Sequence, residues 1–180
     1  MEIERFFIEG LLLIKPKVFA DDRGYFLESY NKKSFNDFGI DAEFVQDNES
    51  KSSKGVLRGL HFQTPPFAQG KLVRVIKGEV MDVAVDIRKN SPTYGKHIKV
   101  NLSEENKYFF YIPAGFAHGF VTLRDNTIFS YKCTNIYNKE SEGSLYWNDE
   151  LISIDWNIEN PLLSEKDKII KNFNEFVSPF

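Results

Sequence analysis

Apolar residues in this chain gather in many short runs, and turn-forming residues separate them at intervals of about 8–12 positions. In the run 79–86, Met81, Val83 and Val85 occupy every second position. A period of two is typical of a β-strand, because successive side chains point to opposite faces of the sheet. The pattern predicts strands at residues 11–14, 25–30, 44–46, 56–60, 71–76, 79–86, 97–102, 108–112, 116–123, 127–132 and 143–147.

Only two segments favour a helix. Residues 34–38 are followed by Gly39, and glycine often ends a helix. In the tail, Ser164 and Asp167 have the spacing of a capping box, with apolar residues after them at 169–173. The pattern predicts an all-β chain, folded as an antiparallel sandwich or barrel, with a few short helices mainly at the C-terminus.

The length of 180 residues suits one domain, and no repeat or long linker divides the chain. We therefore expect a single domain over residues 1–180. Hydrophobic residues make up 42% of the chain, and they include 17 Phe and 8 Tyr. This composition can fill a sizeable core, and the aromatic excess favours strands over helices.

Charge and cysteine content narrow the possible partners. The net charge is -3 and the basic residues are scattered, which argues against a nucleic-acid partner. No apolar run approaches the ~18 residues of a membrane span, and no signal peptide opens the sequence. Cys133 is the only cysteine, so no disulfide can form within the chain. We expect a cytoplasmic protein that does not associate with membranes.

Two of the three histidines, His61 and His118, lie beside glycines in apolar runs of the predicted sheet. An imidazole with a pKa near its ordinary value of about 6.5 can accept or donate a proton at neutral pH. The run 113–118 has the pattern P-x-G-x-x-H, which matches the second half of the cupin signature. Cupins are double-sheet jelly rolls.

Many cupins hold a transition metal, and the first half of their signature should offer H-x-H. Here the corresponding residues are His61-Phe62-Gln63, and glutamine is a poor ligand for such metals. The third histidine, His97, stands alone. Scattered histidines and one cysteine favour a cupin-like barrel that works without a metal or other cofactor.

Taken together, the motifs resemble the dTDP-4-dehydrorhamnose 3,5-epimerase family, a metal-free group with a cupin-like jelly-roll barrel. The matching segments run in order along nearly the whole chain, at 22–28, 46–48, 55–61, 69–75, 82–88, 113–120, 131–133, 147–149 and 163–167. One small departure is Asn157 after Trp156, where the family usually has proline. The resemblance implies a homodimer in which the N-terminal strands pair with the partner's sheet. The implied substrate is a dTDP-linked 4-keto-6-deoxy sugar.

Epimerisation of such a sugar needs a base on one face, an acid on the other and a group that stabilises the enolate. The resemblance implies that His61 is the base and that Tyr131 is the proton donor. It implies that Asp167 orients His61, although Asp167 is also the third residue of the predicted capping box. Lys71 would lie near the sugar's O4 and stabilise the developing oxyanion.

The resemblance also implies a set of contacts to the nucleotide sugar. Arginine forks suit a diphosphate, and aromatic rings suit stacking on a thymine. Arg23 and Phe26 would serve the neighbouring subunit's pocket, and Glu142 could equally be a solvated loop charge. The full expected set is Arg23, Phe26, Glu28, Gln46, Asp47, Asn48, Arg58, His118, Tyr137, Glu142 and Lys166.

Several functions stay open at this level. The leading one is inversion of C3 and C5 of dTDP-4-dehydro-6-deoxy-D-glucose to give dTDP-4-dehydro-L-rhamnose, in dTDP-L-rhamnose biosynthesis. A single-site epimerase for a related nucleotide-linked 4-keto sugar would use the same base and acid. A metal-dependent cupin enzyme and a sugar-nucleotide binding module without catalysis fit the motifs less well.

Overall fold

A computed structural model describes residues 1–180, and it consists mainly of short strands. None of the helices has the length and apolar character that a membrane crossing requires. The helical elements are α1 (Lys32–Asp37) and the 3-10 helices η1 (Lys139–Ser141) and η2 (Phe173–Glu175). The strands are β1 (Glu2–Arg5), β2 (Leu12–Lys15), β3 (Val18–Asp21), β4 (Gly24–Leu27), β5 (Gln46–Ser52), β6 (Leu57–Gln63), β7 (Lys71–Lys77), β8 (Glu79–Asp86), β9 (His97–Ser103), β10 (Phe109–Ile112), β11 (Phe116–Thr122), β12 (Thr127–Cys133) and β13 (Glu142–Ser144).

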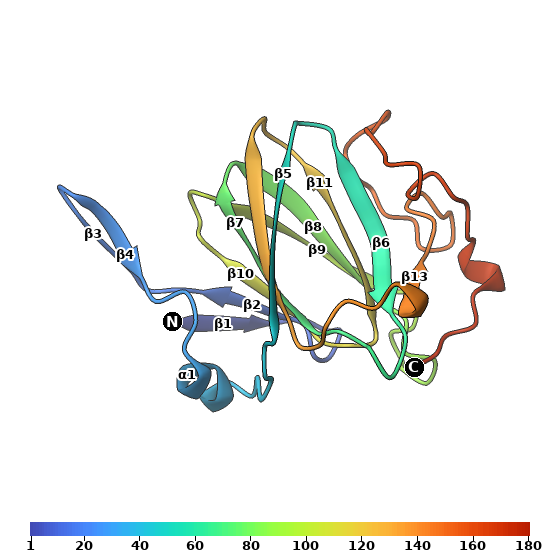
Figure 1. Ribbon diagram of the computed structural model, residues 1–180, viewed down its shortest axis with the longest axis horizontal. Helices are drawn as coiled ribbons and strands as arrows, with labels where there is room; N and C mark the ends of the chain where they lie inside the picture. Colours follow the sequence, from blue (N-terminus) through green and yellow to red (C-terminus); the bar gives the residue numbers. More distant parts are fainter.

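The strands form two antiparallel sheets and a separate hairpin (Figure 1). One sheet has six strands in the order β1-β2-β10-β7-β12-β5, and the other has five in the order β13-β6-β11-β8-β9. Neighbours in each sheet are often far apart in sequence, so the chain crosses between the sheets repeatedly, as in a jelly roll. The all-β, antiparallel, cupin-like fold predicted from the sequence is confirmed.

The main core lies between the two sheets. Val73, Phe110 and Phe129 of the six-stranded sheet meet Val80 and Phe120 of the five-stranded sheet there, and all five are buried. Burial of a side chain of this size stabilises the fold by roughly 1.5–3 kcal/mol. This shared core therefore fixes the distance between the two sheets and the shape of any cavity between them.

A second core covers the outer face of the five-stranded sheet. Val83 and Val85 of β8 pack there against Trp147, Ile154 and Trp156 of the segment that follows β13. This C-terminal segment lies beside the sheet as irregular chain (Figure 1). As a result, β8 is buried on both faces, although its sequence alternates as a half-exposed strand would.

The tail differs from the expectation of a C-terminal helix, because residues 165–168 form a turn and no helix begins there. The Asp167 N–H does donate to Ser164 Oγ at 3.3 Å, as in a capping box. The chain then leaves the helical path, and the carbonyl of Lys171 accepts a hydrogen bond from the Tyr146 N–H. The one α-helix is α1, near the helix expected at 34–38, and the two 3-10 helices η1 and η2 lie in the last quarter of the chain.

The hydrophobic pattern did not identify β5, whose sequence QDNESKS contains no apolar residue. It is a strand because it pairs with β12 along its whole length and forms the edge of the six-stranded sheet. Its side chains alternate between an exposed face and a half-buried face that carries Gln46, Asn48 and Ser50. Polar residues that line a cavity give no hydrophobic signal. The strands β1 and β3 were missed as well.

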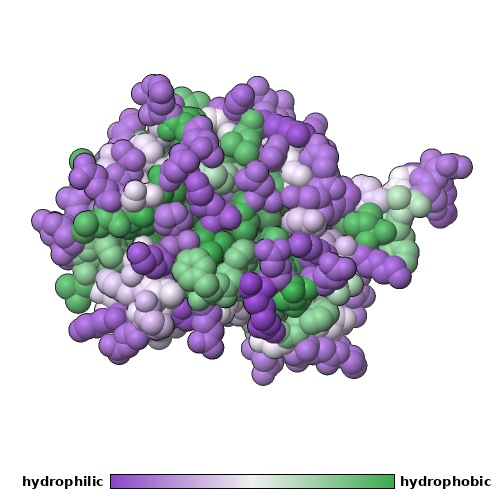
Figure 2. Space-filling view, turned by 180° about the vertical axis from the view of Figure 1, so that it is seen from behind, coloured by the Kyte–Doolittle hydropathy of each residue, from purple (hydrophilic) through white to green (hydrophobic).

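The strands β3 and β4 form a hairpin that projects from the body of the molecule (Figure 1). Its aromatic side chains Phe19, Tyr25 and Phe26 are each more than half exposed. Seen from behind, the arm carries apolar surface on the part nearer the body of the molecule, and its tip is hydrophilic (Figure 2). Exposed strands with apolar side chains mark a contact surface, because unpaired strand edges readily pair with another chain.

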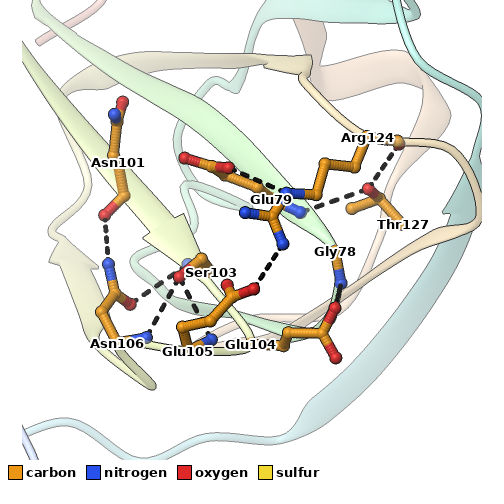
Figure 3. Close-up of polar contacts among 9 residues, drawn as sticks. All are labelled: Gly78, Glu79, Asn101, Ser103, Glu104, Glu105, Asn106, Arg124 and Thr127. Carbon is orange, nitrogen blue, oxygen red and sulfur yellow. Dashed lines mark hydrogen bonds and ion pairs between the residues drawn. The ribbon is translucent and has the colours of Figure 1, made fainter.

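A polar network ties together the β7–β8, β9–β10 and β11–β12 connections (Figure 3). Arg124 Nε lies 3.1 Å from Glu79 Oε2, and Arg124 also pairs with Glu105. The Gly78 N–H donates to Glu104 Oε1 at 2.9 Å. Because Ile128 pairs with Lys77 and Cys133 with Lys71, this network lies at one end of β7 and β12.

Candidate active site

Two adjoining chambers open between the sheets, with volumes of about 350 and 270 Å³. His61, Lys71 and Tyr131 line both of them. Their combined size is in the range of small-molecule sites. The first chamber is also lined by Gln46, Asn48, Phe62, Gln63, Gln69, Tyr137 and Glu142, and the second by Ser50, Arg58, His118, Phe120, Phe129, Ser164, Lys166 and Asp167.

His61 on β6 is bonded to Asp167 of the tail, with Nε2 2.6 Å from Oδ1. The other oxygen of Asp167 accepts from Ser164 Oγ at 2.7 Å. Burial alone would raise the pKa of the Asp167 carboxyl, but the hydrogen bonds from His61 and Ser164 outweigh it and lower this pKa. An ionised carboxylate only accepts, so Nε2 is the donor to Asp167, and in the neutral imidazole Nδ1 carries the lone pair. The pair has the arrangement of an oriented base.

Tyr131 faces the same chambers from the other sheet. It lies on β12 of the six-stranded sheet, whereas His61 lies on β6 of the five-stranded sheet. Burial raises the pKa of the Tyr131 phenol, which therefore stays protonated at neutral pH. A protonated phenol can donate to a strongly basic carbanion. The base and the acid expected from the sequence thus lie on opposite walls of one cavity.

Lys71 begins β7 beside Tyr131, with its Nζ 5.9 Å from the centre of the Tyr131 ring. Burial lowers the pKa of the Lys71 ammonium, and the nearby Cys133 and Asp82 partly counteract that effect. A cation that is already desolvated interacts strongly with negative charge that develops next to it. The position of Lys71 suits an oxyanion stabiliser.

His118 lies on β11 directly across from His61 in the register of β6 and β11. Its Nε2 is 3.0 and 2.9 Å from the two carboxylate oxygens of Asp82, and both side chains are buried. Burial lowers the pKa of His118 and outweighs the neighbouring carboxylate. The His118 side chain is therefore uncharged at neutral pH, and it forms part of the wall of the second chamber.

Gly59 and Gly119 let β6 and β11 approach closely beside the two histidines. A Cβ added at Gly59 would lie 2.5 Å from Gly119 Cα, and one at Gly119 would lie 2.9 Å from the Arg58 carbonyl oxygen. Gly59 also has a φ of 141°, which other residues rarely adopt. The glycines of the two sequence motifs therefore set the spacing of the strands that carry His61 and His118.

Three of the expected charged contacts border the chambers. Arg58 donates from Nε and Nη2 to Ser52 Oγ at 3.3 and 3.2 Å, and its guanidinium borders the second chamber. Lys166 borders the second chamber and pairs with Glu142, which borders the first. This ion pair joins the two chambers at their boundary, so Glu142 is more than a solvated loop charge.

Gln46, Asn48 and Tyr137 gather in the first chamber. Gln46 Nε2 donates to Asn48 Oδ1 at 3.1 Å, and Asn48 Nδ2 lies 3.7 Å from the sulfur of Cys133. Tyr137 is 54% exposed, and its hydroxyl donates to Glu142 Oε2 at 3.4 Å. The side-chain amides of Gln46 and Asn48, together with the Tyr137 ring, suit recognition of a heterocyclic base.

The structure does not bring the remaining expected contacts to the chambers of their own chain. Asp47 points to the opposite face of β5 from Asn48 and pairs with Lys132 at 2.9 Å. Arg23 and Phe26 lie on the projecting hairpin, where both are exposed. Glu28 follows β4 and accepts from Asn31 Nδ2.

Sequence reasoning missed several residues that line the chambers. Ser50 shares the inward face of β5 with Gln46 and Asn48, and a period-two assignment of that strand would have found it. Phe120 and Phe129 stack at 4.2 Å and line the second chamber. Nothing in the sequence distinguishes these two rings from ordinary core residues.

The described residues form no group of three or more His, Cys, Asp or Glu side chains that could hold a metal. Gln63, at the place of the second ligand in H-x-H, uses its amide on backbone groups. His61 Nε2 is bonded to Asp167. His61 Nε2 and the Gln63 amide are therefore committed to hydrogen bonds with the protein.

A family model described as dTDP-4-dehydrorhamnose 3,5-epimerase matches residues 5–175. The match includes the hairpin, both chambers and the tail that carries Asp167. The chain belongs to the dTDP-4-dehydrorhamnose 3,5-epimerase family. The family resemblance noted from the sequence motifs is confirmed.

Individual epimerases are similar over most of their length. A dTDP-4-dehydrorhamnose 3,5-epimerase from Shigella flexneri is 58% identical over 161 residues, which are 89% of each chain. A crystal structure from Legionella pneumophila Philadelphia 1, a dTDP-6-deoxy-D-glucose-3,5-epimerase in complex with dTDP-4-keto-L-rhamnose, aligns with a TM-score of 0.94 and 49% identity. That alignment covers 98% of this chain and 94% of the other. A 3'-monoepimerase from Streptomyces bikiniensis in complex with dTDP-quinovose aligns with a TM-score of 0.88 and 32% identity, over 93% of this chain and 85% of the other.

Proposed function

We propose that this protein inverts C3 and C5 of dTDP-4-dehydro-6-deoxy-D-glucose and releases dTDP-4-dehydro-L-rhamnose. The observation that carries the proposal is the placement of His61 and Tyr131 on opposite walls of one cavity, beside the half-buried Lys71. Inversion of a carbon centre by proton transfer needs a base and an acid on opposite faces. Membership of the epimerase family supports the substrate class.

The chemistry follows from the ketone at C4, which makes the hydrogens on C3 and C5 acidic. Nδ1 of His61 removes one of these protons, and the electron pair moves onto the C4 oxygen to form an enolate. The ammonium of Lys71 stabilises that negative charge. Tyr131 then donates a proton to the same carbon from the opposite face. Asp167 holds the imidazole and stabilises the imidazolium that forms.

The nucleoside would occupy the first chamber, and the diphosphate would extend to the second chamber, which Arg58 and Lys166 line. In this arrangement Tyr137 stacks on the thymine, and Gln46 and Asn48 hydrogen-bond to the nucleoside. Arg58 and Lys166 pair with the diphosphate, since their charges complement its own. His118 contributes a neutral hydrogen-bonding wall beside the sugar.

We also propose a homodimer in which the hairpin of each copy completes the site of the other. Arg23, Phe26 and Glu28 lie outside the chambers of their own chain, on or next to the projecting hairpin. The strand β5 is an edge of the six-stranded sheet and lines the first chamber, so its free backbone groups can pair with an arriving arm. Each subunit would be a single domain over residues 1–180 and would work in the cytoplasm without a cofactor.

Incubation with dTDP-4-dehydro-6-deoxy-D-glucose in D₂O, followed by proton NMR, tests the reaction. The expected result is deuterium at both C3 and C5 of an L-rhamno product. Deuterium with inversion at C3 alone would identify a single-site epimerase, and no exchange at all would contradict epimerase chemistry. His61→Ala is the matched control, because it should bind dTDP and exchange neither proton. Stoichiometric bound iron, nickel or manganese by elemental analysis would instead support a metal-dependent cupin.

A further inference from the structure

The loop that follows β12 carries Tyr137, and glutamine side chains from two different strands hold its backbone. Gln46 of β5 accepts a hydrogen bond from the Tyr137 N–H, with Oε1 at 2.8 Å. Gln63 of β6 bonds to the residues on both sides of Tyr137. The backbone around this exposed ring is therefore fixed from both sheets.

Gln63 makes three hydrogen bonds to backbone groups and is only 5% exposed. Its Nε2 donates to the Ile136 carbonyl at 3.1 Å and to the Phe67 carbonyl at 2.7 Å. Its Oε1 accepts from the Asn138 N–H at 2.8 Å. The carbonyl before Tyr137 and the N–H after it thus meet the same amide group.

These bonds leave Gln63 with no N–H to offer a ligand. A primary amide has two N–H donors, and both are used on backbone carbonyls. Gln63 nevertheless lines the first chamber. It follows His61 by two residues in β6, so both side chains lie on the same face of the strand. Any effect of Gln63 on binding must therefore act through what it holds in place.

We propose that Gln63 is a positioning residue for Tyr137, so that it sets nucleotide affinity without touching the nucleotide. This inference rests on the proposed function, in which the Tyr137 ring stacks on the base. Gln63 occupies the place where a metal-binding cupin has its second histidine. In this chain that position fixes the base-stacking loop.

The consequence of losing the amide follows from the groups it pairs. Without it, two carbonyls and one N–H lose their partners at a partly buried position. The loop would then shift to let these groups reach water, and the Tyr137 ring would be held less firmly, by the remaining bonds to Gln46 and Glu142. The cost appears on binding, when the ring must be ordered again.

The test is a double-mutant cycle with Gln63→Leu, Tyr137→Ala and the combined variant. The measured quantities are the Kd of dTDP by calorimetry, and KM and kcat with the keto sugar. Tyr137→Ala should weaken dTDP binding by about 10-fold, since stacking of a base on an aromatic ring is commonly worth that factor or more. Gln63→Leu should raise the Kd and KM by roughly 5- to 10-fold and leave kcat within about two-fold. The combined variant should bind dTDP as weakly as Tyr137→Ala alone.

Asn106 provides a matched control at the other end of the strands (Figure 3). Its side-chain amide also makes three backbone hydrogen bonds, accepting from the N–H groups of Ser103 and Tyr108 and donating to the carbonyl of Asn101. Asn106→Leu should lower the melting temperature but leave the Kd of dTDP unchanged. If Gln63→Leu does not fold, Gln63→Glu serves instead, because it keeps the acceptor for Asn138 and removes both donors.

Three outcomes would overturn the inference. Losses in dTDP affinity that multiply in the combined variant would show that Gln63 acts independently of Tyr137. A fall in kcat with an unchanged Kd in Gln63→Leu would assign it to the chemistry instead. Unchanged dTDP affinity in Tyr137→Ala would show that the Tyr137 ring does not stack on the base. That result would contradict the proposed binding mode, whereas the first two outcomes would contradict only the positioning role of Gln63.

Discussion

His61 and Asp167 are 106 positions apart in the chain, and their side chains meet at 2.6 Å. The contact forms because the tail after β13 folds back along the five-stranded sheet and brings Ser164, Lys166 and Asp167 to the second chamber. Ser164 holds the second oxygen of the carboxylate, so one short turn fixes both the carboxylate and the imidazole.

Asp167→Asn should lower kcat by on the order of 10³-fold and change the Kd of dTDP little, because the imidazole loses the charge that orients and stabilises it. Steady-state kinetics and calorimetry check the two quantities. Ser164→Ala removes only one hydrogen bond from the carboxylate and should cost less than about 10-fold in kcat. Equal losses in the two variants would contradict a direct role for Asp167.

Tyr131→Phe should separate proton removal from inversion. His61 can still remove a proton and return one to the same face, so deuterium from D₂O enters the substrate while the configuration is retained. Proton NMR of the recovered sugar distinguishes the two processes. Inversion at the wild-type rate in Tyr131→Phe would show that another group is the acid.

The loss of activity on the alkaline side of the pH–rate profile should reflect deprotonation of Lys71. Its ammonium must be charged to stabilise the enolate, and burial lowers its pKa from 10.5, so activity falls as the pH rises through that lowered value. The pKa of Tyr131 is raised above 10.0, so the phenol stays protonated over the same range. Lys71→Gln should lose about 10²–10³-fold in kcat, and its residual activity should lack this alkaline loss. An alkaline loss that survives in Lys71→Gln belongs to a different group.

Asp86 should make a pH-dependent contribution to stability. Burial would raise the pKa of its carboxyl, but hydrogen bonds from Arg88, Ser91 and Thr93 lower it from 3.8 to about 2. A lowered pKa stabilises the folded state above the unfolded value, and this stabilisation disappears as the pH falls from about 4 through about 2. The difference in unfolding free energy between wild type and Asp86→Asn should therefore be larger at pH 6 than at pH 2 by about 2 kcal/mol. Urea unfolding at both pH values measures it, and a constant difference would refute the linkage.

The proposed exchange of hairpins can be tested by mixing two inactive variants. Arg23→Ala lacks the contact that the hairpin would make to the bound nucleotide sugar, and His61→Ala lacks the base. If the arm acts on the partner's chamber, random reassortment restores about a quarter of the sites, because one site in each mixed dimer is intact. Activity of the mixture after unfolding and refolding together measures this fraction. An arm that serves its own chain would restore nothing, and a fully active monomer by light scattering would also exclude the exchange.

The hydrophobic pattern predicted most of the strands, and the sequence motifs predicted most of the residues that line the chambers. The strand at 79–86 was placed correctly because Met81, Val83 and Val85 repeat with a period of two. The chemistry-bearing residues His61, Tyr131 and Lys71 were named from the family resemblance, and the fold does bring them to one cavity.

The parts that could not be predicted depend on contacts that no local pattern encodes. The capping-box spacing of Ser164 and Asp167 suggested a helix, but the segment forms a turn in which Asp167 accepts a hydrogen bond from His61, 106 residues away. The polar strand β5 is held by its neighbour β12 and not by its own hydrophobicity. Gln63 was noticed only as a missing metal ligand, since its partners come from loops that the sequence does not place.

The glycine contact between β6 and β11 has a practical consequence for anyone who wishes to redesign this enzyme. Gly59 and Gly119 touch through bare backbone, so a single methyl group at either position would wedge the two strands apart. The wedge would move both imidazoles at once, since each lies one or two residues from a glycine on its own strand. Libraries that diversify the pocket should keep both positions as glycine, because any side chain there would disturb the relative placement of His61 and His118.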